Sequence, residues 1–201
     1  MSLNFSIKII FENDYLTFAE TSGLQSVSLL SESVADNTLP TYGVIARTGS
    51  VSFIDSNSAF LNKIKSKDCP IEVEIYQNNV LWGSFVATKK CTYNVFSKEA
   101  TMEIKGNITN WQSTTVEKKA ITYDQTAYQI LLYLISLQDI APTISDVGIS
   151  NDTVTFLQSI TVPYFYLESG TLWEQFDKLC NLAQLRIYQD KKNKVIIERY
   201  V

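Results

Sequence analysis

The 201-residue chain contains no histidine. That absence excludes Ser-His-Asp and Cys-His catalytic groups and histidine-based metal sites, and it removes the commonest general base. The seven glycines are scattered, and none belongs to a phosphate-binding loop, a dinucleotide fingerprint or a nucleophile elbow. The acidic residues do not have the spacing of a calcium loop. We therefore expect no enzymatic activity and no cofactor or metal.

Cysteine is also scarce. The three cysteines, Cys69, Cys91 and Cys180, are widely separated, odd in number and without a C-x-x-C pair. This usage argues against a disulfide framework and favours a reducing, cytosolic origin. Cys180 falls on an apolar stripe, where a small buried hydrophobic residue is the simplest interpretation.

Long apolar runs and basic patches are missing as well. The longest apolar run, residues 130–135, is far shorter than the roughly 20 residues of a membrane helix. The first residues lack the basic segment and long apolar stretch of a secretory signal. With 17 basic and 21 acidic residues, the net charge is -4. We expect no membrane insertion and no nucleic-acid partner, sequence-specific recognition included.

The content of the chain fits a globular protein, with 45% hydrophobic and 19% charged residues. Residues 1–115 carry β-strand patterns separated by turns, which predict an antiparallel β-barrel or a sandwich-like domain. Asn78-Asn79 is a tight hairpin signal, and Gly83 predicts a bend or bulge in a long strand. Residues 58–65 indicate a short helix. The predicted strands are Asn4–Phe11, Gln25–Glu32, Gly43–Ile54, Ile71–Tyr76, Val80–Tyr93 and Ala100–Trp111.

The pattern changes after a polar stretch at residues 112–119, where we place the domain boundary. A capping box at Thr122 and Gln125 and apolar residues at helical spacing predict a helix over about 124–138. Residues 152–157 alternate as a strand would.

The last forty residues hold the clearest local signals. Thr171 and Glu174 form a second capping box ahead of an apolar stripe, which predicts a helix over about 171–184. The period then changes to two, and a hairpin is predicted over about 186–200. Residues 120–201 are thus expected to form a smaller α+β domain with two helices and a C-terminal β-hairpin, which makes the whole chain α+β.

Six aromatic residues are the candidate interface residues. They could form a platform for a sugar, but packing in a core or against another subunit is favoured, since tryptophan and tyrosine are common in both places. An exposed aromatic cluster just before the last helix would be an interface candidate. The six residues are Trp82, Trp111, Tyr164, Phe165, Tyr166 and Trp173.

Two carboxylate pairs keep a hydrolase hypothesis open, because glycoside hydrolases work with paired acids. The pairs are Glu72 with Glu74 and Glu99 with Glu103. Strand alternation puts Glu72 and Glu74 on one face, opposite three apolar neighbours. A solvated face of a half-buried strand is therefore the favoured interpretation.

Three motifs, in order along the chain, resemble the first half of phage tail hub proteins, the central baseplate or tail-tip proteins of bacteriophages. The family has a glycine-containing step within its barrel, then a capped leucine-rich helix, then a Gly-Thr-Leu helix followed by an Ile-Tyr strand. The corresponding segments here are Leu81–Val86, Asp124–Gln138, Gly170–Glu174 with Leu179, Ile187-Tyr188 with Asp190, and Lys194-Val195.

The resemblance implies a structural part of a tail tip or baseplate hub, forming part of a ring around the tail lumen and linking the tail tube to spike or fibre parts. It implies a homo-oligomer, trimer or hexamer, with other tail and baseplate proteins as partners. It further implies assembly in the host bacterial cytoplasm and residence in the virion tail. The acidic balance would suit a lumen through which DNA slides.

One departure concerns the second barrel with which such hubs usually continue. The sequence ends at Val201, straight after a predicted strand. The resemblance therefore implies a piece of a longer protein, a chain that closes its ring as a hexamer, or one that borrows a second barrel. The alternative function is a carbohydrate- or receptor-binding β module of a tail adsorption protein.

Overall fold

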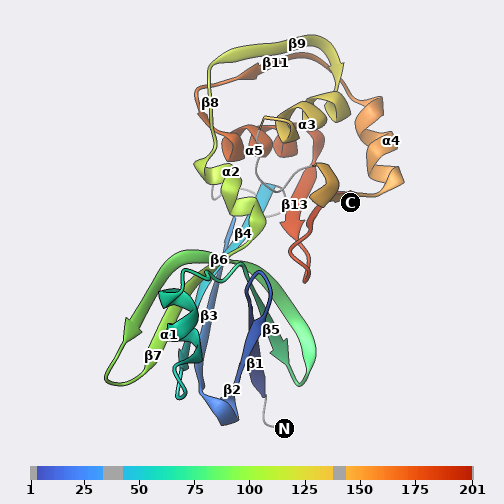
Figure 1. Cartoon of the computed structure of the whole chain (residues 1–201). Coiled ribbons are helices and arrows are strands. Elements are labelled where there is room, and N and C mark those ends of the chain that lie inside the picture. Colours follow the sequence, from blue (N-terminus) through green and yellow to red (C-terminus); the bar gives the residue numbers. More distant parts are fainter. Residues whose placement is uncertain (1–3, 34–42, 138–143, 201) are drawn as a thin grey trace. The chain divides into compact units, whose positions relative to one another are not determined.

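The computed structural model describes residues 4–33, 43–137 and 144–200 and confirms the α+β class (Figure 1). The described chain forms two compact units. Unit 1 contains residues 4–30, 47–106 and 191–193, and unit 2 contains the rest. The units are not continuous in sequence. Residues 43–46 of strand β4 belong to unit 2, although the same strand continues into unit 1.

Unit 1 is built around one sheet, in the strand order β2-β1-β5-β6-β7-β4-β3. The described pairs of β1 with β2 and β5, of β6 with β5 and β7, and of β4 with β7 are all antiparallel. Its elements are β1 (Phe5–Ile10), β2 (Tyr15–Ala19), η1 (Glu20–Ser22), β3 (Leu24–Ser33), β4 (Gly43–Ile54), α1 (Ala59–Lys65), β5 (Glu72–Gln77), β6 (Val80–Asn94) and β7 (Glu99–Lys105).

The predicted closed barrel is not formed by the described strands. Within them, β2 pairs only with β1 and β3 only with β4, so the sheet has two ends. The turn between these strands explains the opening: η1 and Gly23 separate β2 from β3. Gly23 has φ of 120°, and a Cβ there would lie 2.6 Å from the Ile54 carbonyl oxygen. Its own carbonyl accepts the Ile54 N–H at 2.7 Å, which fixes β3 beside β4.

The core of unit 1 follows from strand alternation. Ile7 and Ile9 of β1 and Val73 and Ile75 of β5 are fully buried, while the two glutamates that alternate with the β5 pair are only partly buried. The rings of Phe53 and Phe60 meet edge to face in the same core, with centroids 4.9 Å apart. Through the buried ring of Phe60, helix α1 thereby packs against one side of the sheet.

Strand β6 is the longest of the described strands and bends twice (Figure 1). Ile75 pairs with Gly83 and Tyr76 with Leu81, so one extra residue, Trp82, sits in a bulge beside Gly83, as the glycine predicted. A second irregularity follows Ala87. Because of these bends, β6 crosses unit 1 from the β5–β6 turn on one side to the β6–β7 turn on the other.

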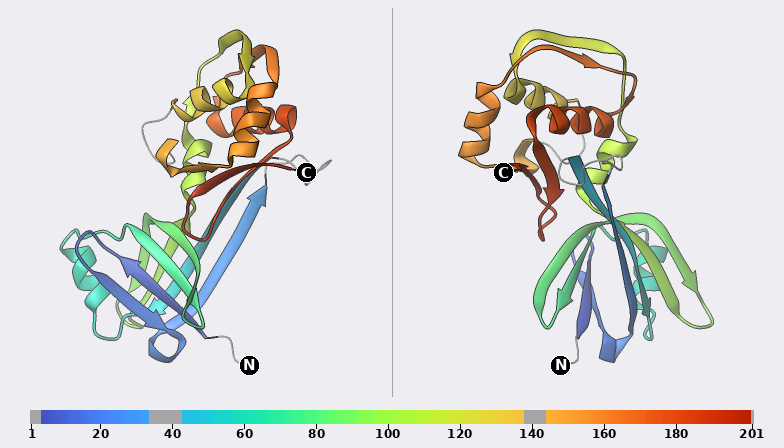
Figure 2. Two further views of the ribbon diagram at one scale, coloured as in Figure 1. Left: turned by 90° about the vertical axis from the view of Figure 1, so that its right-hand side faces the viewer. Right: turned by 180° about the vertical axis from the view of Figure 1, so that it is seen from behind.

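Unit 2 combines four α-helices with two two-stranded sheets and with strands β10, β14 and β13 of the ten-stranded sheet (Figure 2). Here β10, β14 and β13 continue to the first residues of β4, while β9 pairs with β11 and β8 with β12. Its elements are η2 (Asn107–Thr109), α2 (Asn110–Ser113), β8 (Thr115–Val116), β9 (Lys119–Thr126), α3 (Ala127–Ile135), η3 (Ile144–Asp146), β10 (Val147–Ile149), α4 (Asn151–Ser159), β11 (Thr161–Leu167), β12 (Gly170–Thr171), α5 (Leu172–Ala183), β13 (Leu185–Gln189) and β14 (Val195–Arg199).

Three predictions for this region were wrong. The helix expected from residue 124 begins at Ala127, and its capping box is Thr126 with Gln129 rather than Thr122 with Gln125. The preceding residues extend because β9 pairs along its length with β11. The strand expected at 152–157 is helix α4, whose first turn is capped by the Ser150 hydroxyl accepting from Thr153 N–H at 3.2 Å. A third correction concerns the predicted strand Ala100–Trp111, which ends at Lys105 and is followed by η2 and the short helix α2. With α2 and α4 added, the predicted two helices become four.

The C-terminal block has the predicted form. Thr171 Oγ1 accepts the Glu174 N–H at 3.3 Å, and the Glu174 carboxylate accepts the Thr171 N–H at 2.8 Å, which is the predicted capping box. Helix α5 ends at Gln184, which takes the left-handed conformation with φ of 51°. The β13–β14 hairpin follows, and Leu185, Ile187, Val195 and Ile197 face the core of unit 2.

Candidate functional site

The site that best combines exposed apolar surface with a hollow lies in unit 1. A groove of about 330 Å³ is bounded by β3, by the start of β1, by η1 and by the bulge of β6. Its apolar lining consists of Phe5, Leu24, Val27, Leu29 and Trp82, and its one charged lining residue is Glu20. The Glu20 carboxylate accepts the Phe5 N–H at 3.2 Å, which ties η1 to the start of β1.

Trp82 is the interface candidate that belongs to this groove. It is 38% exposed, which is high for so large an apolar side chain. The bulge explains its position, because an extra residue in a strand redirects the side chain that occupies it. Val27 and Leu29 reach the same groove from β3, two residues apart and hence on one strand face.

A second exposed apolar feature, the tip, is the β6–β7 turn, Val95–Lys98. Phe96 is 99% exposed and Val95 68% exposed. The turn is nevertheless well fixed: Asn94 Oδ1 accepts the N–H of Phe96 at 3.0 Å and of Ser97 at 3.3 Å, and Lys98 Nζ donates to the Ser56 carbonyl at 2.7 Å. In the sequence this segment lies between the predicted strands Val80–Tyr93 and Ala100–Trp111, and a phenylalanine in a turn was the available signal.

Three of the six interface candidates lie inside unit 2. Trp111 is fully buried and stacks on Phe176 with ring centroids 3.8 Å apart. Trp173 and Phe165 are 2% and 5% exposed. Core packing, one of the two locations considered for these aromatics, is therefore where the structure puts them. Their burial corrects their selection as interface candidates, since it leaves no side-chain surface for a partner.

Tyr164 and Tyr166, by contrast, form an aromatic face on β11. Their rings stack with centroids 6.0 Å apart, and Tyr164 is 52% exposed. The Lys118 ammonium lies 5.5 Å from the centroid of Tyr166. A stacked tyrosine pair with a cation beside it could accept a flat apolar face of a ligand.

The carboxylates considered for hydrolysis have structural partners. Glu74 contacts Lys8 Nζ at 3.2 Å and accepts from the Tyr76 hydroxyl at 2.8 Å. This hydrogen bond, then burial and the charge of Glu74, raise the pKa of Tyr76. Glu72 accepts from the Ser84 hydroxyl. These contacts support the solvated-face interpretation of the pair.

The second carboxylate pair lies on β7. Glu99 pairs across the sheet with Ile54 and Asn94 at one end of the strand. Glu103 lies nearer the other end and borders a polar hollow with Ser50 and Lys105. Among the described residues, no group of three or more Cys, Asp or Glu is placed to hold a metal ion.

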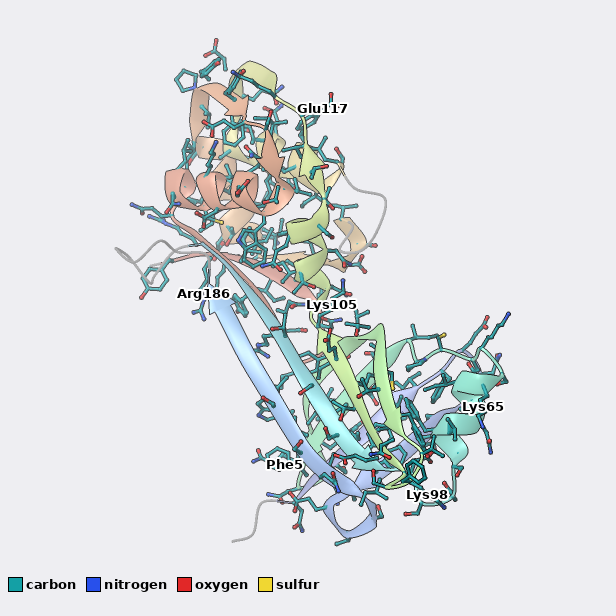
Figure 3. The ribbon with its side chains drawn as sticks, turned by 90° about the vertical axis from the view of Figure 1, so that its left-hand side faces the viewer. Phe5, Lys65, Lys98, Lys105, Glu117 and Arg186 are labelled. Atoms are coloured by element: carbon teal, nitrogen blue, oxygen red, sulfur yellow. The ribbon has the colours of Figure 1, made fainter. Side chains whose placement is uncertain are left out.

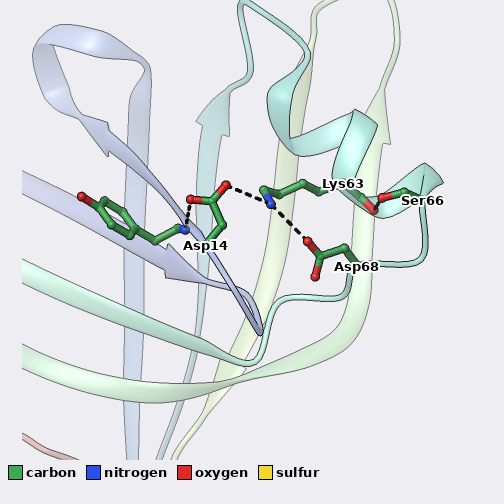
Figure 4. A network of polar contacts seen from close by, with 5 residues as sticks. Asp14, Lys63, Ser66 and Asp68 are labelled. Carbon is green, nitrogen blue, oxygen red and sulfur yellow. Dashed lines mark hydrogen bonds and ion pairs between the residues drawn. The ribbon is translucent and has the colours of Figure 1, made fainter.

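A small ionic network supports α1 (Figure 4). Lys63 Nζ lies 3.2 Å from Asp14 and 3.1 Å from Asp68. The Tyr15 N–H at 2.7 Å, and next Lys63, lower the pKa of Asp14. The carboxylates of Asp68, first, and of Asp14 in turn raise the pKa of Lys63. The network joins α1 to the β1–β2 turn, so its role is structural.

Comparisons with known proteins identify the fold. No family model matches the sequence, and no curated protein matches it. The tail protein of Neisseria meningitidis MC58 superposes with a TM-score of 0.57 and 7% identity, over 96% of this chain and 50% of that one. The 43 kDa tail protein of prophage MuSo2 from Shewanella oneidensis gives 0.53 and 11%, over 99% and 56%. The chain shares its fold with about half the length of each.

The described helices contain no apolar segment of the length that a bilayer crossing requires.

Proposed function

We propose that the chain is a structural component of a phage or prophage-derived tail, located at the tail tip or baseplate hub. In this role it forms part of a ring around the tail lumen and links the tail tube to spike or fibre parts. The observation that carries the proposal is the shared fold: nearly the whole chain superposes on two tail proteins. The order of three hub-like motifs along the sequence supports it independently.

The chemistry of the surface agrees with an assembly role. The paired glutamates of β5 are engaged by Lys8, Tyr76 and Ser84, and no histidine is present to act as a general base. What the described surface offers instead is apolar: the groove with Trp82 and the tip with Phe96. Exposed apolar surface of this kind is typical of contacts between proteins.

The test is assembly with the tail tube. The purified chain is mixed with the tube protein of its own virus and followed by light scattering and negative-stain imaging. Rings of three or six copies, or attachment of the chain to one end of the tube, would support the proposal. A chain that neither forms rings nor attaches to tubes, and that is absent from purified tails, would contradict it.

A second candidate function is carbohydrate or receptor binding by a tail adsorption protein. The stacked pair Tyr164 and Tyr166, with Lys118 beside it, is the observation that favours it. Glycan-array binding that is lost in Tyr164→Ala and kept in Tyr15→Ala would support this role. Tyr15 is a matched control because it is similarly exposed, at 57%, and carries a lysine over its ring, but belongs to unit 1. Absence of binding to any glycan would remove this candidate.

A further inference from the structure

We infer that the tip of one copy, Val95–Lys98, docks in the β3–Trp82 groove of a second copy, so that copies associate head to tail. The inference rests on the proposed function, which requires a ring, and adds the contact that would build it. Its two halves, an exposed apolar projection and an apolar hollow, belong to the same unit.

The tip projects from a turn that is already ordered. The Asn94 side chain holds the N–H groups of Phe96 and Ser97, while the Lys98 carbonyl accepts the Asp55 N–H at 2.8 Å. Because the turn is fixed from both sides, docking it would cost little conformational entropy. A phenylalanine side chain that is 99% exposed also leaves its whole apolar area available to a partner.

The groove has the chemistry to accept such a side chain. Its apolar lining surrounds about 330 Å³, near the lower end of the size range of ligand pockets, which suits one aromatic side chain rather than an extended ligand. Trp82 and Phe5 provide ring surfaces for edge or face contact with Phe96.

Charge selects a second copy as the occupant. Glu20 is the only charged residue in the groove lining, and Lys98 is the only charged residue of the tip. Lys98 Nζ uses one carbonyl, that of Ser56, and has further donors, while Glu20 accepts one N–H and has a further oxygen. With Phe96 in the groove, these opposite charges meet at its rim, where they favour correct pairing.

The placement of the two halves suits a ring. Trp82 lies near the start of β6 and the tip follows its end, and the two ends of β6 lie on opposite sides of unit 1 (Figure 1). Figure 3 likewise separates Phe5, at the groove, from Lys98, at the tip. A projection and a complementary hollow at different places on one molecule make a head-to-tail contact, which closes into a ring when the rotation permits.

One tip is a small contact, so each pairwise step should be weak. Interfaces below about 1,200 Å² are typically transient. Closing the ring would make the last contact intramolecular and strengthen the whole assembly. We therefore expect association that rises with concentration and ends at one closed size.

The experiment uses two variants with opposite defects, measured by sedimentation velocity. Phe96→Asp removes the apolar side chain of the tip and leaves the groove intact. Gln25→Arg places a charged side chain in the groove, from the strand face that carries Val27 and Leu29, and repels Lys98 but leaves the tip intact. Both positions are exposed, so the fold should be kept. Each variant alone is expected to associate at least tenfold more weakly than wild type. Mixed together they should form a 1:1 pair, since one intact tip and one intact groove remain.

The control is Ile71→Asp, which removes an apolar side chain that is 52% exposed in the same unit but outside the groove. It should associate like wild type. If wild type forms rings and Phe96→Asp forms them equally well, the inference is wrong while the proposed function stands. A wild-type chain that stays monomeric throughout also overturns the inference, and attachment to tail tubes then decides the proposed function separately.

Discussion

The two units differ in where they place their tryptophans. Unit 2 buries its tryptophans: Trp111 and Trp173 lie in a core with Phe176. Unit 1 leaves Trp82 partly exposed and Phe96 fully exposed, although its core buries other phenylalanines. Aromatic content alone therefore does not indicate an exposed surface for a partner. A strand bulge and an ordered turn are what bring Trp82 and Phe96 outward.

The units also differ in how their helices start. In unit 2, α3, α4 and α5 are capped by residues adjacent in sequence, Thr126, Ser150 and Thr171. In unit 1, the first N–H groups of α1 are satisfied from a strand end: Asp55 accepts from Phe60 at 3.1 Å and Leu61 at 2.9 Å. The helices of unit 2 are thus capped by the residue next to them, whereas α1 of unit 1 is capped by a buried carboxylate a few residues upstream, at the end of β4.

The largest expected effect is in the core of unit 2. Trp111→Ala removes a fully buried ring that stacks on Phe176, and should lower the free energy of unfolding by about 3–5 kcal/mol. Urea unfolding followed by far-UV circular dichroism measures the change. Trp82→Ala is the control, because this tryptophan is partly exposed, and it should lower the free energy of unfolding far less. Equal losses of unfolding free energy in both variants would contradict this difference between the two units.

The next effect tests the cap of α1 by the buried Asp55. Asp55→Ala leaves the Phe60 and Leu61 N–H groups without their acceptor and removes the partner of the Tyr93 hydroxyl at 3.2 Å. Because Asp55 is fully buried, we expect a loss of about 2 kcal/mol in the same urea experiment. Asp55→Asn, which keeps one acceptor oxygen, should lose less. If the alanine variant is as stable as wild type, α1 does not depend on this residue.

A local cap should matter less. Thr171→Ala removes the side-chain acceptor of the Glu174 N–H and should cost about 1 kcal/mol. Thr171→Ser keeps the hydroxyl and should be close to wild type, which separates the cap from other roles of the position. The urea midpoints of the three proteins provide the measurement, and a serine variant as unstable as the alanine one would contradict the cap.

The smallest effect concerns the ionic network of unit 1. Lys63→Met should raise the pKa of Asp14 part of the way to its ordinary value, because the Tyr15 N–H still lowers it. Since the pKa of Asp14 is lower folded than unfolded, its stabilising contribution is present above the unfolded pKa. That contribution is lost as the pH falls through the folded pKa.

Carboxyl carbon shifts in an NMR titration measure the Asp14 pKa directly. Lys65→Met removes a charge from the same helix without touching the Asp14 pair and is the matched control (Figure 3). An Asp14 pKa that is the same in Lys63→Met and wild type would show that the ion pair has no influence on it.

Sequence predicted best what was local. The α5 capping box, the β13–β14 hairpin and the bulge at Gly83 were predicted from a few adjacent residues. The residues before Ala127 were misjudged because pairing of β9 with β11, distant in sequence, decides their conformation. The open sheet of unit 1 follows from Gly23 against Ile54, again a distant contact.

The candidate site shows the same distinction between features that adjacent residues predict and features that depend on contacts distant in sequence. Trp82 was named as an interface candidate from its residue type alone. The groove that it lines is assembled from β1, η1, β3 and β6, which no short stretch of sequence contains. Phe96 was not among the predicted interface residues, and its exposure is visible only in the structure.

Because residues 43–46 belong to unit 2, the protein cannot be divided into its two units by a single cut in the sequence. Strand β13 pairs in parallel with β4, Arg186 opposite Gly43 and Ile187 opposite Val44. A fragment starting at residue 107 would contain all the helices of unit 2, yet β13 would be left with an open edge that invites aggregation. A separately expressed C-terminal half should therefore be made with residues 43–46 supplied, either by circular permutation or as an added peptide.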